Sequence, residues 1–288
     1  MTELLALTSA LFYGAADFFG GLTARRASTV ATVLMSQFVG LVLLVVALPF
    51  LPGAAVTPAD WIWGVVAGLS GGIGVALLYR ALAVGTMTVV APITAVCAAM
   101  IPVLFAFVMG ERLRPLTLVG VALAFVAIAL VSQPGTREQV AASRSSEKRA
   151  FPPGVLLALL SGVIIGLFFL ALARTNTAAG MWPLLAARIT SVTLFGAIAL
   201  ATGRSIRLNA SATATATAGG VLDMVANALY MIAARVGPLS IVITLASLYP
   251  AATVILARVV LGERLGFLQT AGIGCALAAV VIIVGTTG

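Results

Sequence analysis

Long runs of apolar residues fill most of the chain, separated by short stretches that contain charged residues, glycine or proline. The runs are continuous and do not alternate with polar positions, which indicates helices and excludes the strands of a membrane β-barrel. An apolar run of about 20 residues is long enough to cross a bilayer as a helix. The sequence predicts about ten such spans, at approximately 4–22, 31–50, 61–80, 89–109, 115–131, 154–173, 182–201, 212–234, 239–261 and 267–285.

Three glycines in the third run, Gly64, Gly68 and Gly72, are spaced by four residues. They therefore lie on one face of the predicted helix. Small residues at this spacing let the backbone of a second helix approach closely. We expect this face to pack directly against another span.

The composition indicates that the chain is surrounded by lipid. It has 288 residues, of which 62% are hydrophobic and 8% are charged. Because soluble domains average about 25% charged residues, the sequence predicts an all-α integral membrane protein whose surroundings are the lipid bilayer. The net charge of +8 does not indicate a nucleic-acid partner, because the basic residues lie mostly at the ends of apolar runs, where they orient a membrane protein.

Several classes of chemistry lack the residues that they need. The chain contains no histidine, which excludes histidine metal ligands and a Ser-His-Asp triad. Cys97 and Cys275 both lie inside apolar runs and are interpreted as packing residues. No Gly-x-x-x-x-Gly-Lys-Ser/Thr pattern for ATP is present. We therefore expect no metal, no cofactor, no catalytic residues and no enzymatic activity.

An internal repeat organises the sequence. The tetrapeptide Gly-Glu-Arg-Leu occurs at 110–113 and again at 262–265, an offset of 152 residues. The same offset relates Ser9 to Ser161, Gly14 to Gly166, Gly68 to Gly220, Gly85 to Gly237 and Gly120 to Gly272. We predict a first repeat at 1–132, a polar linker at 133–153 and a second repeat at 154–288. Because each repeat has five spans, the second enters the membrane inverted relative to the first, an architecture typical of secondary transporters.

The repeated tetrapeptide itself is interpreted as structural. Gly110 and Gly262 can each end a helix. Glu111 and Glu263 then lie at the start of the next helix, where a negative charge suits the helix dipole. Pro115 fits an early position of the helix that follows the first copy.

The segments that carry this motif resemble the EamA family of the drug/metabolite transporter superfamily. They are 92–113, ending Val-Met-Gly-Glu-Arg-Leu, and 249–265, ending Val-Leu-Gly-Glu-Arg-Leu. In that family a proline-containing span ends in Gly-Glu-Arg and a glycine-containing span follows, twice per chain. The resemblance implies ten helices in two inverted halves, a central cavity lined mainly by spans one to four and six to nine, and peripheral fifth and tenth spans. It also implies transport of small molecules, which for many bacterial relatives is export across the cell membrane.

Two arguments about orientation disagree. Ten basic residues face the cytoplasm if the N-terminus lies outside the cell, and four do so if it lies inside. Since positively charged loops favour the cytoplasm, the count favours both termini outside. The resemblance implies both termini inside, and the two alternatives stay open.

Two acids lie inside spans, where a charged side chain costs about 2.5–3.5 kcal/mol. Asp17 shares one helical stripe with Tyr13, and Asp223 shares a face with Asn227 and Tyr230. A carboxyl in a medium of low dielectric can exchange a proton near neutral pH, so both acids are candidates for proton coupling or for binding a cationic group. The alternative is a structural hydrogen bond or an ion pair.

Other polar positions within spans have two interpretations. Arg188 lies inside the seventh span, where it either binds a substrate carboxylate or pairs with Asp17 or Asp223. Thr244 and Ser247 on the ninth span either contact substrate or satisfy carbonyls freed by a nearby proline. Gln37 in the second span has the same two interpretations, substrate contact or a structural hydrogen bond.

These features favour a secondary active transporter that exports a small polar metabolite or drug-like solute by alternating access, with proton coupling as a hypothesis. A structural or sensory polytopic membrane protein is the alternative. The expected location is the bacterial plasma membrane, and a monomer is compatible with the sequence.

Overall fold

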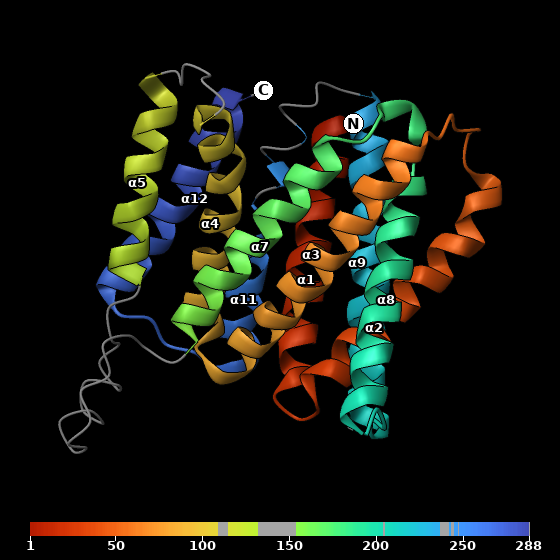
Figure 1. Ribbon diagram of the computed structural model, residues 1–288. Helices are drawn as coiled ribbons and strands as arrows, with labels where there is room; N and C mark the ends of the chain where they lie inside the picture. The colour runs from red at the N-terminus through yellow and green to blue at the C-terminus, as the bar shows by residue number, and fades with distance from the viewer. Residues whose placement is uncertain are drawn as a thin grey trace.

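The computed structural model describes residues 1–108, 115–131, 154–203, 205–236, 242, 245–246 and 248–287. Ten α-helices and two short 3-10 turns account for most of these residues (Figure 1). Six of the helices are long and apolar enough to cross a membrane, and four shorter ones are also apolar.

The helices of the first half begin and end within four residues of the predicted spans. They are α1 (Thr2–Ala24), α2 (Thr29–Ala47), α3 (Pro58–Val84), α4 (Met87–Val108) and α5 (Pro115–Val131). The first 3-10 turn, η1 (Leu48–Phe50), extends α2 to the predicted end of its span.

The second half follows the same plan. Its helices are α7 (Val155–Ala173), α8 (Trp182–Thr202), α9 (Ala210–Val236), α11 (Tyr249–Leu261) and α12 (Phe267–Thr287), with the 3-10 turn η2 (Thr177–Ala179) between the first two. Only the ninth predicted span differs from its helix by more than four residues. Most of positions 239–248 lie outside the described residues, and α11 begins at Tyr249.

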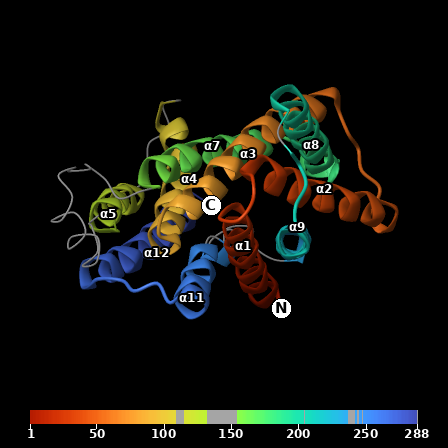
Figure 2. The same cartoon turned by 90° about the horizontal axis from the view of Figure 1, so that it is seen from below.

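The helices form one bundle in which the two termini lie at the same end (Figure 1). Seen along the bundle, α5 and α12 lie together at one edge, and α2 and α8 lie at the other (Figure 2). The peripheral place of the fifth and last helices agrees with what the family resemblance implies. The remaining helices enclose the centre of the molecule.

Reciprocal contacts hold the two halves together. Helix α1 packs along α9, and α3 packs along α7. The hydroxyl of Ser9 donates to the carbonyl of Ala226 at 2.8 Å, and the hydroxyl of Ser161 donates to the carbonyl of Gly74 at 2.8 Å. Both members of the second bond are related to those of the first by the 152-residue offset. The first helix of each half is therefore bonded to the third helix of the other.

The glycine face of α3 packs on α8, as expected. A Cβ atom at Gly64 would lie 2.7 Å from the carbonyl oxygen of Pro183, and one at Gly68 would lie 2.5 Å from that of Ala187. At Gly72 it would lie 3.0 Å from the Cβ of Ser191, also on α8. Only residues without a side chain allow the two backbones to come this close.

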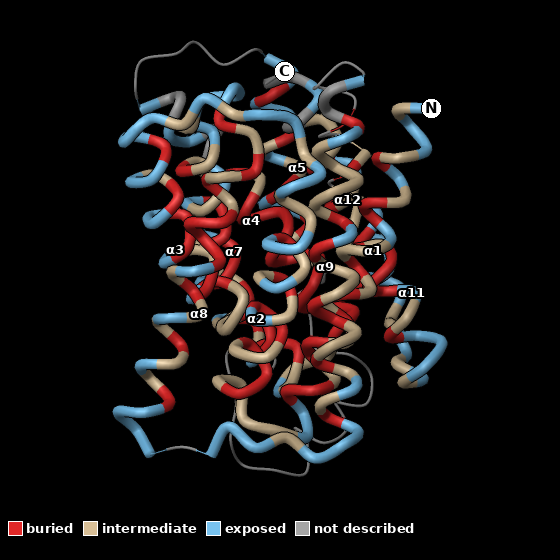
Figure 3. Tube along the Cα trace, turned by 90° about the vertical axis from the view of Figure 1, so that its right-hand side faces the viewer, coloured by how far each residue is buried: buried red, intermediate tan, exposed pale blue. Residues whose placement is uncertain are grey.

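Many large apolar residues are exposed, and exposed positions occur along the outer helices of the bundle (Figure 3). Leu200, Phe125 and Val46, for example, are 86%, 61% and 62% exposed. A surface of this kind would be unfavourable in water over so large an area, but it matches the hydrocarbon of a bilayer.

The second copy of the repeated tetrapeptide confirms one expectation and corrects another. Gly262 ends α11 with a left-handed φ of 63°. Glu263, however, does not start the next helix, because α12 begins only at Phe267. Its carboxylate instead accepts from the backbone N–H groups of Met87 and Thr88, at 3.1 and 3.0 Å, and so caps the N-terminus of α4 in the other half.

Glu263 can reach α4 because residues 262–266 form a non-helical loop. The loop places its carboxylate beside the free backbone N–H groups at the start of that helix. The same carboxylate also pairs with Arg25 at the end of α1, at 3.1 Å. Gly110 and Glu111 of the first copy lie outside the described residues. Pro115 is the first residue of α5, as predicted.

Candidate functional site

Charged residues from both halves meet inside the bundle. The guanidinium of Arg188, on α8, donates to the carboxylate of Asp223 on α9 and to the side-chain oxygen of Gln37 on α2. Arg188 is only 7% exposed. An arginine retains its charge when it is buried, so it needs partners of this kind in the interior of a membrane protein.

The surroundings of this pair fix its position. Gly40 lies one turn from Gln37 on α2, and a Cβ atom there would lie 3.4 Å from the guanidinium, so this helix face leaves space for the arginine. Asn227 donates through Nδ2 to the backbone carbonyl of Asp223 at 2.7 Å and lies 3.4 Å from the carboxylate. Within the described chain, the Nε atom of Arg188 is buried and has no hydrogen-bond partner.

Asp17 differs from Asp223 in its contacts. It lies on α1, partly exposed, and no described residue forms a hydrogen bond or an ion pair with its carboxylate. It is close enough to Asp223 for the two carboxylates to interact electrostatically. Of the two acids inside helices at this site, one is therefore neutralised and the other is left open.

Tyrosines surround the open acid. The chain has four tyrosines, and all four contribute to this region. The rings of Tyr13 and Tyr249 meet edge to face, with centroids 6.5 Å apart. The ring of Tyr79, on α3, covers Gly20 of α1 so closely that a Cβ there would lie 2.1 Å from the ring.

The tyrosine hydroxyls belong to the same electrostatic environment. Tyr13, Tyr79 and Tyr249 lie within electrostatic range of Asp17. Tyr79 also lies close to Ser36 of α2. Tyr230, on α9, interacts with Tyr13.

The structure thus brings together six of the residues singled out from the sequence: Tyr13, Asp17, Arg188, Asp223, Asn227 and Tyr230. Thr244 and Ser247 lie outside the described residues. Sequence reasoning did not single out Tyr79, Tyr249 or Ser36, and it left Gln37 open. The useful signal would have been that tyrosine is rare in this chain and that each copy lies within an apolar run.

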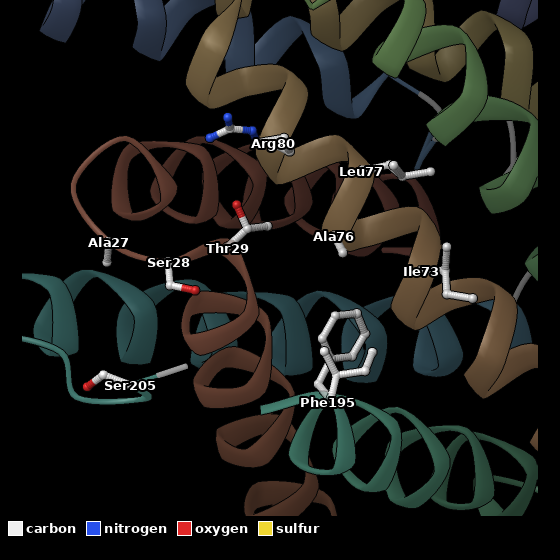
Figure 4. Close-up of a pocket in the computed structure, with 10 residues that line it drawn as sticks. Ala27, Ser28, Thr29, Ile73, Ala76, Leu77, Arg80, Phe195 and Ser205 are labelled. Atoms are coloured by element: carbon white, nitrogen blue, oxygen red, sulfur yellow. The ribbon is translucent and has the colours of Figure 1, made fainter. Parts of the chain in front are cut away.

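A cavity of about 850 Å³ opens between α2, α3 and α8 (Figure 4). The polar residues Ser28, Thr29 and Arg80 line it, and Phe195 and Ile198 line it from α8. It does not contain the charged cluster. Phe195 lies seven residues from Arg188 and therefore on the same face of α8. This face of α8 borders the cavity at Phe195 and reaches the charged cluster at Arg188.

No group of three or more histidine, cysteine or acidic residues that could hold a metal ion occurs in the part of the chain that the structure describes. The side chains of the cluster can bind charged groups electrostatically and can exchange protons. Both are functions of a binding site within a membrane.

Apolar helices around a charged centre define a polytopic membrane protein with an internal polar site. The model of the EamA-like transporter family matches residues 1–133 and, a second time, residues 152–285. The chain belongs to the EamA-like transporter family, and it is accordingly a multi-pass membrane protein of a family of transporters.

A solved structure described only as the crystal structure of a protein has the same fold. It superposes with a TM-score of 0.60 at 17% sequence identity, over 98% of this chain and 95% of the other. No curated protein matched the chain.

Proposed function

We propose that the protein is a secondary transporter that exports a small polar solute by alternating access, with the central cluster as its binding site. The observation that carries the proposal is the meeting of Asp17, from the first half, with Arg188 and Asp223, from the second. Charged residues inside membrane helices are costly, and they commonly mark the path of a substrate or an ion. A site shared by two halves changes its access when the halves rock against each other.

The proposal includes an inverted repeat, with halves at 1–132 and 154–288 joined by a linker at 133–153. Two observations support it. Helix α1 runs away from the end of the bundle that holds the termini, and α7 runs toward that end (Figure 1). The reciprocal bonds of Ser9 and Ser161 relate equivalent positions of the two halves.

Alternating access also needs contacts that close one end of the path. The pair between Arg25 and Glu263 joins the end of α1 to the loop that follows α11. Arg25 also donates to the carbonyls of Leu82 and Gly85 at the end of α3. The pair between Arg25 and Glu263 connects the two halves at the end opposite the termini, and it would separate when that end opens.

Proton coupling is assigned to Asp17 in this proposal. Asp223 is held in an ion pair, whereas the carboxyl of Asp17 has no partner among the described residues. A free carboxyl can bind and release a proton without breaking an existing bond.

The test uses purified protein in proteoliposomes. Counterflow is measured for amino acids, nucleosides, sugars and cationic drugs, with an imposed pH gradient as a second condition. We expect exchange of at least one solute class and loss of solute-driven proton flux in Asp17→Asn, while Glu3→Gln, at an exposed acid, serves as the matched control. Folded protein that exchanges no solute would favour a structural or sensory role, and proton flux unchanged in both Asp17→Asn and Asp223→Asn would refute the coupling.

A further inference from the structure

We infer that the central site takes organic cations, and that Asp17 binds the ammonium group between tyrosine rings. The inference rests on the proposed function and names the substrate class of that same site. It stands on three features of the cluster: its charge balance, its aromatic surroundings and its accessibility.

The charge balance comes first. The single arginine of the cluster is bound to Asp223 and Gln37. With both acids ionised, Asp17 therefore leaves the cluster with one uncompensated negative charge. Arg25, which follows α1, is already paired with Glu263. Because an unpaired charge in a membrane interior is costly, a ligand that brings one positive charge is favoured over a neutral or anionic one.

Aromatic rings flank Asp17 along α1. Gly20 is three residues further along the helix, and the ring of Tyr79 covers it. Tyr13 is one turn before Asp17, and its ring meets the edge of Tyr249. The electron-rich faces of aromatic rings attract alkylammonium groups, and rings grouped around a negative charge are a recurring way to bind them.

Most residues of the site are open to a ligand, whereas Tyr79 is buried. Tyr13, Asp17, Tyr230 and Tyr249 all keep part of their surface exposed, although they lie on helices that pack together inside the bundle. Asp223 keeps 27% of its side chain exposed, whereas its partner Arg188 keeps 8%. The acidic side of the cluster is therefore accessible and the basic side is covered.

The direct test compares ligands of equal shape and different charge. Choline and 3,3-dimethylbutan-1-ol differ only in that carbon replaces the ammonium nitrogen, and 3,3-dimethylbutanoate provides an anion of similar size. A larger quaternary cation, benzyltrimethylammonium, tests wider ligands. Binding is measured by isothermal titration with the full chain in lipid nanodiscs.

We expect a quaternary cation to bind about tenfold or more tightly than the uncharged isostere, and Asp17→Asn to lose about that factor, since each change removes the contact between two opposite charges. Tyr79→Phe keeps the ring and should retain binding, whereas Tyr79→Leu should weaken it severalfold. Glu3→Gln and Gly196→Ala, which lie away from the cluster, are the matched controls. Thermal melting of each variant confirms that it is folded.

Three results would overturn the inference: no binding of either quaternary cation, equal binding of cation and isostere, or undiminished binding in folded Asp17→Asn. Its failure is distinct from failure of the transport proposal. Counterflow of a neutral or anionic solute without cation binding would leave transport intact and remove the cation site. Cation binding without exchange of any solute would leave the cation site intact and remove the transport proposal.

Discussion

Arg188 on α8 is bound to Asp223 on α9, so the ion pair of the central cluster lies wholly within the second half of the chain. The first half contributes Gln37, an uncharged partner, and Asp17, an acid without one. Two aspartates that look equivalent in the sequence therefore have different roles in the folded protein.

Stability should separate the two aspartates. Removing one partner of a buried ion pair leaves the other charge uncompensated and costs about 3–5 kcal/mol, so Asp223→Asn should lower the melting temperature strongly. Asp17→Asn breaks no bond to a described residue and should leave the melting temperature unchanged or slightly raised. The measurement is thermal unfolding of both variants in one detergent.

A double-mutant cycle provides the control for this comparison. Arg188→Met combined with Asp223→Leu removes both charges, and the double variant should be more stable than Asp223→Leu alone. The cycle also needs Arg188→Met alone: if the losses of the two single variants add up to the loss of the double variant, the pair contributes no coupling energy and the prediction is wrong.

Close packing at the glycine face of α3 gives a second prediction. In Gly68→Ala the new methyl group would lie 2.5 Å from the carbonyl oxygen of Ala187, and such overpacking costs about 1–3 kcal/mol. Gly196→Ala, on α8, places its methyl group where no atom lies within 4 Å. It should stabilise the protein by about 0.5–1 kcal/mol, since alanine is the better helix former. Destabilisation by both variants would show that space at Gly68 is not the cause.

The cap on α4 gives a third prediction. Glu263→Ala removes the acceptor for the backbone N–H groups of Met87 and Thr88, and loss of a helix cap costs about 0.5–2 kcal/mol. Arg25→Ala removes the ion pair and the bonds to the carbonyls of Leu82 and Gly85, at a partly exposed position, and should cost less than loss of the cap. Denaturant titration of both variants, with Glu3→Ala as the exposed-acid control, tests this order. An equal loss in Arg25→Ala would mean that the ion pair and not the cap carries the stability.

The reciprocal serine bonds give a fourth prediction. Ser9→Ala and Ser161→Ala each remove one buried hydrogen bond between helices, for which about 0.5–1 kcal/mol is expected in a membrane protein. Since the two bonds occupy equivalent positions, the two losses should be similar, and they should add in the double variant. A large difference between them would show that the two halves are not energetically equivalent.

Much of the fold could be predicted from the sequence because a bilayer restricts a chain so strongly. Apolar runs long enough to span it fold as helices, so the starts and ends of nine helices followed from the pattern. The face formed by Gly64, Gly68 and Gly72 followed as well, because small residues have few other uses on a membrane helix. The end of α11 at Gly262 could also be predicted, because a glycine that ends a helix is a local sequence signal.

The candidate site was only half predictable, for a physical reason. A charged residue within a membrane span has a high free-energy cost and is therefore rare, so Asp17, Arg188 and Asp223 could be recognised in the sequence. An aromatic residue has no such cost in a membrane, so Tyr79 and Tyr249 did not stand out from the apolar runs around them. The partner of Glu263 lies 176 residues away along the chain, at Met87, and no local pattern encodes it.

The bond between Ser9 and Ala226 also has a consequence for biosynthesis. Its two ends are 217 residues apart. At about 5–20 residues per second, a ribosome needs roughly 10–40 s to make the intervening chain. For that interval α1 lies in the membrane without α9, the helix that it packs along, and Asp17 lacks the second half of the chain as a neighbour. The first helix to be made is thus among the last to gain its full set of packing contacts. A nascent chain that stalls midway keeps an acid exposed within the membrane.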